Sequence, residues 1–203
     1  MLKVGITGGI GSGKSYVCEI FKRMGIPVFH ADDVSKEIVE TDSIVKKKII
    51  DLFGAKIYLD GKLNRKAVSE AVFKEKKLLE KLNRIIHPAV FNQFEIWTRK
   101  YNNLPYIVKE AAIIFESGGE KFLDFVITIS AQEELRIARV VKRDQAERNN
   151  VLARIKNQLN DEQRIKKSDY VIINDEKTLL LPQIINIHKD LIEKSSNDYL
   201  NNK

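Results

Sequence analysis

The chain has 203 residues, of which 43% are hydrophobic and 31% are charged, and this balance is typical of a globular protein. Its formal net charge is +7, and no run of about 18 apolar residues occurs that would span a membrane. The early Gly5 argues against a signal peptide, and the single cysteine, Cys18, excludes an internal disulfide. We therefore expect a cytoplasmic protein with no membrane partner, and we expect Cys18 to be a packed thiol.

Positive charge is concentrated in two segments of the chain. Residues 46–100 hold 14 Lys and Arg against 6 Asp and Glu, and residues 133–167 hold 10 against 6. Such segments indicate either anionic ligands or solvated lysine faces, and nucleic acid is possible on charge alone. No interleaved aromatic pattern or known nucleic-acid motif accompanies them, so we expect an anionic small molecule and no nucleic acid.

The first predicted elements alternate between strand and helix. Residues 2–7 form a short apolar strand, and residues 15–24 carry apolar side chains at helical spacing. A second strand covers residues 27–30, and two helices follow it. Gly54 is the stop signal after the second of these helices.

The middle of the chain is predicted to be helical. A turn at Asp60-Gly61 leads to Asn64, which is a suitable N-cap for a helix through Phe73. Pro88 ends the next helix or begins the one after it. We interpret the helical stretch of residues 62–101 as an insertion that carries an acceptor site.

Strands resume in the last half of the chain. They cover residues 106–110, 125–129 and 170–173, and a charged helical segment runs from residue 131 to 167 between the last two. An amphipathic helix with apolar residues from 180 to 191 closes the chain. Five short strands alternating with helices predict an α/β fold with a parallel sheet covered on both faces.

The sequence "ITGGIGSGKS" at residues 6–15 is typical of a phosphate-binding loop. Gly8, Gly13, Lys14 and Ser15 fit the pattern G-x-x-x-x-G-K-[ST] between an apolar strand and a helix. Glycines bring backbone N–H groups close to an anion, and the helix N-terminus adds partial positive charge. Lys14 would reach the β- and γ-phosphates of a nucleoside triphosphate, and Ser15 would ligate Mg²⁺.

Three classes of protein use such a loop. A guanine-nucleotide switch normally carries an N-K-x-D motif, which this chain lacks. A motor or transporter ATPase has an apolar strand ending in an acidic residue, and "YIVKE" at residues 106–110 is a poor version of it because Lys109 interrupts it. A small-molecule kinase needs neither motif and instead needs an acceptor pocket and a basic lid.

Several stretches together resemble the dephospho-CoA kinase family. They are "ITGGIGSGKS", "GIPVFHADDVSKEI", "LNRIIHPAV", "AAIIFESG" and "RVVKRD", in the order and spacing of that family from about Leu2 to Asn174. The resemblance implies transfer of the γ-phosphoryl group of ATP to the ribose 3′-hydroxyl of dephospho-CoA, with Mg²⁺, in the last step of coenzyme A synthesis.

The resemblance also implies a domain organisation. A P-loop kinase core with a five-stranded parallel sheet would comprise residues 1–30 and 102–203, with a lid at about 140–160. A helical acceptor-binding region would cover residues 31–101. The implied partners are ATP and dephospho-CoA, and we expect a monomer or a weak homo-oligomer.

The family's D-A-D motif corresponds to His30-Ala31-Asp32. Its second aspartate, the proposed base for the acceptor hydroxyl, is present as Asp32, whereas the first is replaced by His30. Lys36 replaces the usual arginine, and Ala112 replaces the proline of P-L-L-F-E. These departures concern acceptor geometry. The alternative role for Asp32 is a helix N-cap, for which its neighbour Asp33 is better suited.

The remaining candidate residues follow from the loop and from the resemblance. Lys14, Asp32 and Arg143 are the catalytic candidates, since Arg139 and Arg143 share a helix face that can screen phosphate charge. Glu110 could hold Mg²⁺ through water, and Arg148 and Arg154 are weaker lid candidates. The expected ATP-binding residues are Gly9, Gly11, Ser12, Gly13, Lys14, Ser15, Tyr16, Arg139 and Asn174, and the expected acceptor-binding residues are Asp32, His87, Phe115 and Glu116.

Each of these has a plain structural alternative. Glu110 and Glu116 could be surface carboxylates, His87 could pack at a helix end, Phe115 could belong to the core, and Asn174 could be a turn residue. Two other functions also stay open: a nucleoside or nucleotide kinase with the same core, and a basic ATPase that binds nucleic acid.

Overall fold

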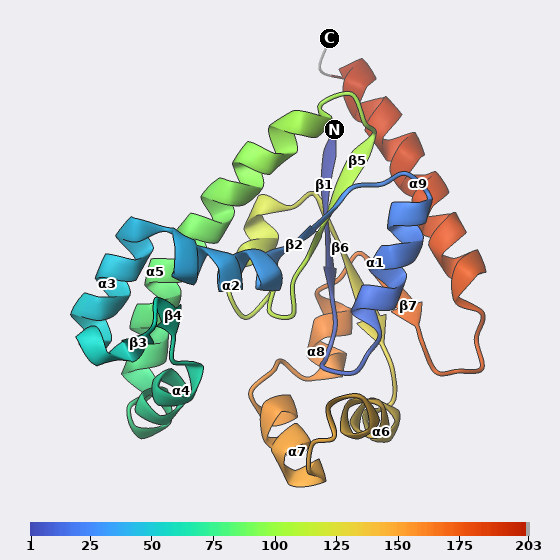
Figure 1. Ribbon diagram of the computed structural model, residues 1–203. Coiled ribbons are helices and arrows are strands. Elements are labelled where there is room, and N and C mark those ends of the chain that lie inside the picture. The colour runs from blue at the N-terminus through green and yellow to red at the C-terminus, as the bar shows by residue number, and fades with distance from the viewer. Residues whose placement is uncertain (202–203) are drawn as a thin grey trace. The chain divides into compact units, whose positions relative to one another are not determined.

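The computed structural model describes residues 1–201, and these form two compact units (Figure 1). One unit holds residues 1–30 together with the chain from residue 101, and the other holds residues 31–100. Within the described part of the chain, no helix has both the length and the apolar character to cross a bilayer.

The first unit is built on a five-stranded parallel sheet. Its strands are β1 (Leu2–Thr7), β2 (Val28–His30), β5 (Tyr106–Glu110), β6 (Phe125–Ser130) and β7 (Tyr170–Ile173). They lie in the order β2-β5-β1-β6-β7. The predicted α/β fold and its five strands are confirmed. Each of the five short apolar runs forms a strand within about one residue of its expected bounds.

Two helices pack together against this sheet. Figure 1 shows α1 (Lys14–Arg23) beside α9 (Leu180–Asn201). The predicted closing helix is therefore confirmed. Strands, α1 and α9 share one apolar core, whose fully buried members include Val4, Ile6, Val17, Cys18, Phe21, Ile127, Ile172, Ile184 and Leu191.

Three helices form the basic segment between β6 and β7. They are α6 (Glu133–Asp144), α7 (Arg148–Lys156) and α8 (Asp161–Lys166), and a short 3₁₀ turn, Gly119–Phe122, precedes β6. The C-cap of α6 is Gln145, whose φ of 51° is left-handed. α7 packs on α6, and α8 packs on β6.

The second unit begins with two helices and a small hairpin. α2 (Ala31–Thr41) is followed by α3 (Ser43–Phe53), which Asp42 caps by accepting from two backbone N–H groups. After a 3₁₀ turn at Ala55–Ile57, strands β3 (Tyr58–Leu59) and β4 (Lys62–Leu63) pair antiparallel. The predicted turn at Asp60-Gly61 is confirmed, and it joins two strands that we did not predict.

The unit ends with α4 (Arg65–Lys74), α5 (Lys76–Thr98) and a 3₁₀ turn, Arg99–Tyr101. Asn64 caps α4 as predicted, since its side chain accepts from the N–H of Ala67 at 3.1 Å.

The prediction that Pro88 separates two helices is wrong, because α5 runs through it without interruption. A proline inside a helix costs about 3 kcal/mol. The buried side chains of Leu82, Val90 and Phe94 lie on both sides of Pro88. Burying each of them contributes about 1.5–3 kcal/mol. The packing of α5 against α2 and α3 therefore outweighs the cost of the proline.

Candidate active site

The phosphate-binding loop joins β1 to α1 and has the backbone that its glycines permit. Gly11 and Gly13 have φ values of 79° and 95°, in the left-handed region that favours glycine. Gly13 is the N-cap of α1, and no side chain in the described structure caps this helix. The first amides of α1 are therefore suited to an anionic ligand.

Close neighbours explain why three loop positions are glycine. A methyl group added to Gly9 would clash with the guanidinium of Arg136, and one added to Gly11 would clash with the carbonyl oxygen of Arg136. A methyl group on Gly13 would meet the side-chain amide of Asn174. Any larger residue at these positions would push the loop away from α6 or from the segment after β7.

The polar side chains of the loop differ in exposure. The ammonium of Lys14 donates to the carbonyl of Gly8 at 2.9 Å, which folds the side chain back over the loop. Ser15 and Tyr16 are exposed. The hydroxyl of Ser12 is buried and has no hydrogen-bond partner among the described residues.

Asn174 connects the end of β7 to the phosphate loop. Its side-chain amide donates to the carbonyl of Ser12 at 2.7 Å, and its backbone N–H donates to Ser130 at 2.8 Å. Beside it lies a cavity of about 770 Å³, whose lining includes Tyr16, Ile20 and Leu180. Its largely apolar walls, with polar groups that include the amide of Asn174, are suited to a flat heterocycle.

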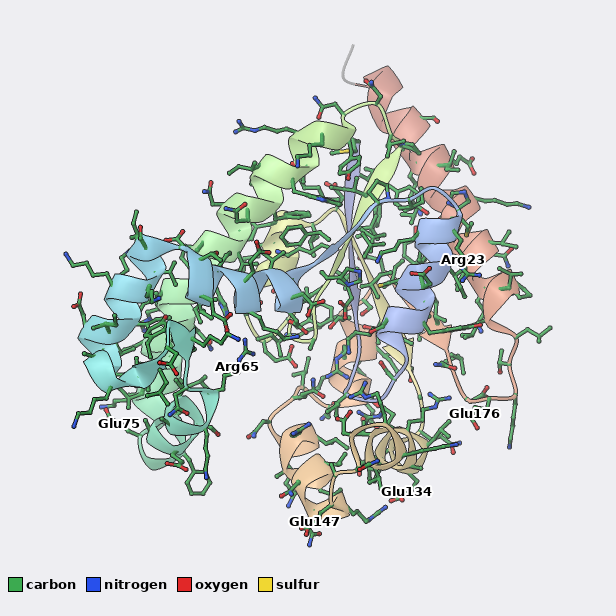
Figure 2. All side chains as sticks on the ribbon, viewed as in Figure 1. Arg23, Arg65, Glu75, Glu134, Glu147 and Glu176 are labelled. Carbon is green, nitrogen blue, oxygen red and sulfur yellow. The ribbon has the colours of Figure 1, made fainter. Side chains whose placement is uncertain are left out.

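Arg139 and Arg143 both lie on α6, as predicted, but their partners differ. Arg139 donates to the carboxylate of Glu176 at 3.0 and 3.1 Å and to the carbonyl of Asn174 at 3.2 Å. Glu176 lies on the segment after β7 (Figure 2). Arg143 is 65% exposed and pairs with Asp144 at 2.7 Å. That hydrogen bond raises the pKa of Arg143 and lowers that of Asp144.

The two weaker lid candidates pair with acidic residues at the surface. Arg148 makes two hydrogen bonds to Glu134, which Figure 2 labels, and these bonds lower the pKa of Glu134. Arg154 lies 3.6 Å from Asp144. Exposed ion pairs of this kind exchange readily, so these arginines are free to take phosphate oxygens instead.

His30, a departure from the family pattern, pairs with Glu110. The two residues are opposite each other in the β2–β5 register, and Nδ1 of His30 lies 3.0 Å from Oε2 of Glu110. Glu110 is only 7% exposed, so it is not the surface carboxylate of our alternative. An aspartate at residue 30 would place a second carboxylate beside Glu110, whereas histidine offers it a hydrogen bond.

Asp32 and Asp33 lie in the first turn of α2, directly after β2. Because α2 begins at Ala31, neither residue is its N-cap, and the expectation that Asp33 caps the helix is wrong. The carboxylate of Asp33 instead accepts from the ammonium of Lys36 at 2.6 Å. Lys36, which stands in place of the family's arginine, is therefore paired with a residue of its own helix. Asp32 is exposed.

The acceptor candidates are distributed over both units. His87 lies half-buried inside α5, so the alternative of helix-end packing is wrong. Phe115 is 7% exposed in the segment after β5, with the ammonium of Lys167 5.8 Å from its ring centroid. Glu116 accepts from the N–H of Leu159 at 2.8 Å. Ala112, which replaces the family's proline, accepts a hydrogen bond at its backbone carbonyl from the hydroxyl of Thr7 at 3.5 Å. A proline also has this carbonyl and could accept the same bond.

Sequence reasoning missed several residues of α6, of α8 and of the segment between these helices. Their side chains contact the phosphate loop or bind the side chains that do. Arg136 lies one turn before Arg139 on the same face of α6, so extending the i, i+4 pair by three residues would have found it. Gln158, Asp161 and Arg164 gave no local signal, because their partners lie far away in the chain.

The residues present fit a magnesium ion that also binds phosphate oxygens. The exposed hydroxyl of Ser15 is a hard oxygen ligand, and the carboxylate of Glu110 lies at the end of β5, opposite Ile6 of β1. Mg²⁺ usually takes one or two protein oxygens and completes its shell with water and substrate phosphates. No group of three or more His, Cys, Asp or Glu side chains in the described ranges forms a separate metal site.

The parallel sheet, the glycine-rich loop after β1 and the basic helices between β6 and β7 define a P-loop kinase. The family model for dephospho-CoA kinase matches residues 2–179. A dephospho-CoA kinase of Bacteroides fragilis is 38% identical over 193 residues, which are 95% of this chain and 94% of the relative. Another, from Salinibacter ruber, is 39% identical over 178 residues, covering 86% and 89% of the two chains.

Solved structures agree with these relatives. A Thermus thermophilus protein superposes with a TM-score of 0.81 at 28% identity, covering 95% of this chain and 97% of that one. The dephospho-CoA kinase from Campylobacter jejuni gives 0.66 at 25% identity, covering 95% and 98%. The chain therefore belongs to the dephospho-CoA kinase family and is an ATP-dependent kinase.

Proposed function

We propose that this chain transfers the γ-phosphoryl group of ATP to the ribose 3′-hydroxyl of dephospho-CoA, releasing coenzyme A and ADP. The observation that carries the proposal is the phosphate loop, Gly8 to Ser15, which leads into the N-terminus of α1, where no described side chain caps the helix. This loop lies inside a family match that covers residues 2–179. The reaction needs little covalent chemistry from the protein, so its residues act mainly by position and charge.

The loop would bind the phosphates of ATP. The amides of Gly11, Gly13 and Ser15 offer N–H donors, and Lys14 would leave the carbonyl of Gly8 to bind the β- and γ-phosphates. Gly9 lies against Arg136 of α6, and the carbonyl of Ser12 accepts from Asn174, so these two residues would keep the loop close to α6 and to the segment after β7. The cavity beside Tyr16 and Asn174 has the size and apolar walls that an adenine ring needs.

Mg²⁺ would be held by Ser15, with Glu110 binding one of its waters. The ion, when bound, neutralises charge on the β- and γ-phosphates. His30 would then orient the carboxylate of Glu110 through their 3.0 Å contact. Oxygen ligands of this kind are those that Mg²⁺ prefers.

Arg139 and Arg143 would supply the positive charge that phosphoryl transfer needs. Both lie on α6 next to the loop's supports, and each is paired with a carboxylate that a phosphate could replace. Arg143 is the more exposed of the two and is the better candidate for the migrating group.

The acceptor would be bound by the helical region of residues 31–101. Asp32 would orient the 3′-hydroxyl and accept its proton, while His87, Phe115 and Glu116 would contact dephospho-CoA. The surplus of lysine and arginine in residues 46–100 suits an acceptor that carries a diphosphate. Further parts of the proposal are a cytoplasmic location, a monomer or weak homo-oligomer, and no nucleic-acid partner.

An ADP-release assay tests this function. Dephospho-CoA, AMP, a mixture of nucleosides and DNA are each added separately to the protein with MgATP. We expect release of ADP to follow the addition of dephospho-CoA alone. Faster release with AMP or a nucleoside would favour a nucleotide or nucleoside kinase, and stimulation by DNA would favour a nucleic-acid-binding ATPase.

A further inference from the structure

The phosphate loop is attached to the segment between α7 and α8. The backbone N–H of Ile10 donates to the side-chain oxygen of Gln158 at 2.8 Å, although the two residues are 148 positions apart. Within the loop itself, the N–H of Ser12 donates to Gly9 at 3.1 Å. A side chain from another element therefore complements the loop's own turn.

The residue next to Gln158 is held through both its backbone N–H and its backbone carbonyl. The N–H of Leu159 donates to Glu116 at 2.8 Å, and its carbonyl accepts from Arg164 at 2.6 Å. Glu116 follows β5, whereas Arg164 lies in α8. Because two elements of the core unit bind the backbone N–H and carbonyl of this one residue, the position of the neighbouring Gln158 is well determined.

Two buried arginines and their carboxylate partners complete the support. Arg164 is fully buried and binds Asp161 at 2.5 Å, and Asp161 lies 3.1 Å from Arg136, which is 5% exposed. Positive and negative groups thus alternate from Arg136 through Asp161 and Arg164 to Glu116. The two arginines are buried, whereas Asp161 and Glu116 are partly exposed. Removing a carboxylate would leave a buried guanidinium unpaired, which is strongly unfavourable, so the set resists rearrangement.

We propose that Gln158 is a positioning residue for ATP, which fixes the amide of Ile10 and thereby the shape of the phosphate loop. The inference rests on the proposed function, since ATP is the ligand that the loop receives there. Gly8, Gly9 and Gly11 surround Ile10, and glycine permits many backbone shapes. Without the bond to Gln158, the loop would spend part of its time in shapes that do not bind phosphates, and ATP affinity would fall by that fraction.

Gln158→Met tests the proposal directly, because methionine keeps the length of the side chain and removes the acceptor. Gln158 is only half-buried, so we expect the variant to fold with an unchanged thermal midpoint. A lost hydrogen bond to a loop amide corresponds to roughly tenfold weaker ATP binding. We expect that loss in the Kd for ATP by calorimetry, with little change in kcat at saturating ATP.

Two further variants separate positioning from general effects. Gln163→Met is the matched control, since Gln163 is exposed and, among the described residues, only its backbone N–H makes a side-chain contact, to Asn160. Gln158→Glu keeps an acceptor for Ile10 but adds a negative charge. Its ATP affinity should fall at low salt and recover as salt is added, because screening weakens the repulsion of the phosphates.

Amide hydrogen exchange of Ile10, followed by NMR without nucleotide, provides a readout independent of ATP. We expect slow exchange in the wild type and in Gln158→Glu, and fast exchange in Gln158→Met. Equal exchange in the wild type and Gln158→Met would overturn the proposal, as would unchanged ATP affinity in Gln158→Met or an equal loss in Gln163→Met. If the wild type bound no ATP, the proposed function would fail, while the exchange of Ile10 would still decide this inference.

Discussion

The side-chain amide of Asn174 donates to the backbone carbonyl of Ser12 at 2.7 Å, and so ties the segment after β7 to the phosphate loop. This one bond brings a residue that lines the cavity beside Tyr16 into contact with the phosphate loop. The base and the phosphates of ATP would therefore be positioned together.

Asn174→Ala should weaken ATP binding. The variant removes a hydrogen bond of about 1 kcal/mol and leaves the carbonyl of Ser12 without its donor, so we expect the Kd for ATP to rise roughly tenfold. Calorimetric titration with ATP measures this, and Asn149→Ala, an exposed position on α7, is the control. Equal affinities of the two variants would show that the bond does not shape the loop.

Gly13→Ala should weaken ATP binding at least as much as Asn174→Ala, whereas Gly25→Ala should not affect it. These glycines lie at opposite ends of α1 with similar φ values of 95° and 83°. A methyl group at Gly13 meets Asn174, but one at Gly25 meets nothing within 4 Å. Both variants carry the backbone strain of about 1–2 kcal/mol. Only Gly13→Ala adds the clash, which a comparison of ATP titration with thermal unfolding will show.

Arg143→Ala should lower kcat more than it weakens ATP binding, because negative charge develops mainly in the transition state. Arg143→Lys should restore activity only in part, since it loses the planar pair of donors. Steady-state kinetics with ATP and acceptor varied separately measure both effects. An unchanged kcat in Arg143→Ala would remove this residue from the site.

Asp32→Asn should lower kcat by roughly 10²–10⁴, the usual range for general acid–base help. ATP affinity should change little. Asp33→Asn should cost far less, because Asp33 binds Lys36 of its own helix at 2.6 Å. The two folded variants are compared by steady-state kinetics. If Asp33→Asn is the inactive one, the assignment of the D-A-D motif is displaced by one residue.

The thiol of Cys18 should make stability fall with rising pH. Burial, with a smaller contribution from Glu110, raises the pKa of Cys18 to about 12 from an ordinary value of 9.0. Above pH 9 the unfolded chain loses this proton and the folded chain keeps it, so the free energy of unfolding decreases by at most about 1.4 kcal/mol per pH unit.

Urea unfolding between pH 8.5 and pH 9.5, which lies below the ordinary tyrosine pKa of about 10, measures this slope. Cys18→Ala should have a smaller slope than the wild type, even though its stability at neutral pH is also lower. Identical slopes would mean that Cys18 does not keep its proton in the folded protein.

Local patterns in the sequence predicted the fold well. Short apolar runs between glycines and helical repeats identified all five strands of the sheet, because a buried parallel strand is apolar along its whole length. The same reasoning failed at Pro88, where the burial of Leu82, Val90 and Phe94 overrides a local stop signal. It also missed β3 and β4, which are only two residues long each.

The candidate site was predictable only where its residues are close in the chain. The phosphate loop is one continuous motif, and its assigned roles in binding ATP stay predictions, as do those of Asp32, His87 and Glu116. The bond of Gln158 to Ile10 and that of Asn174 to Ser12 join residues about 150 positions apart. No local pattern encodes such pairs, because only the folded sheet brings them together.

The site of phosphorylation on the product tests the central claim most directly. The protein is incubated with MgATP and dephospho-CoA, and the nucleotide product is examined by ³¹P NMR with coupling to ribose protons. We predict one new phosphomonoester signal coupled to the 3′ proton, together with an equal amount of ADP. A phosphate on any other oxygen, or ADP formed with inorganic phosphate and unchanged dephospho-CoA, would contradict the account.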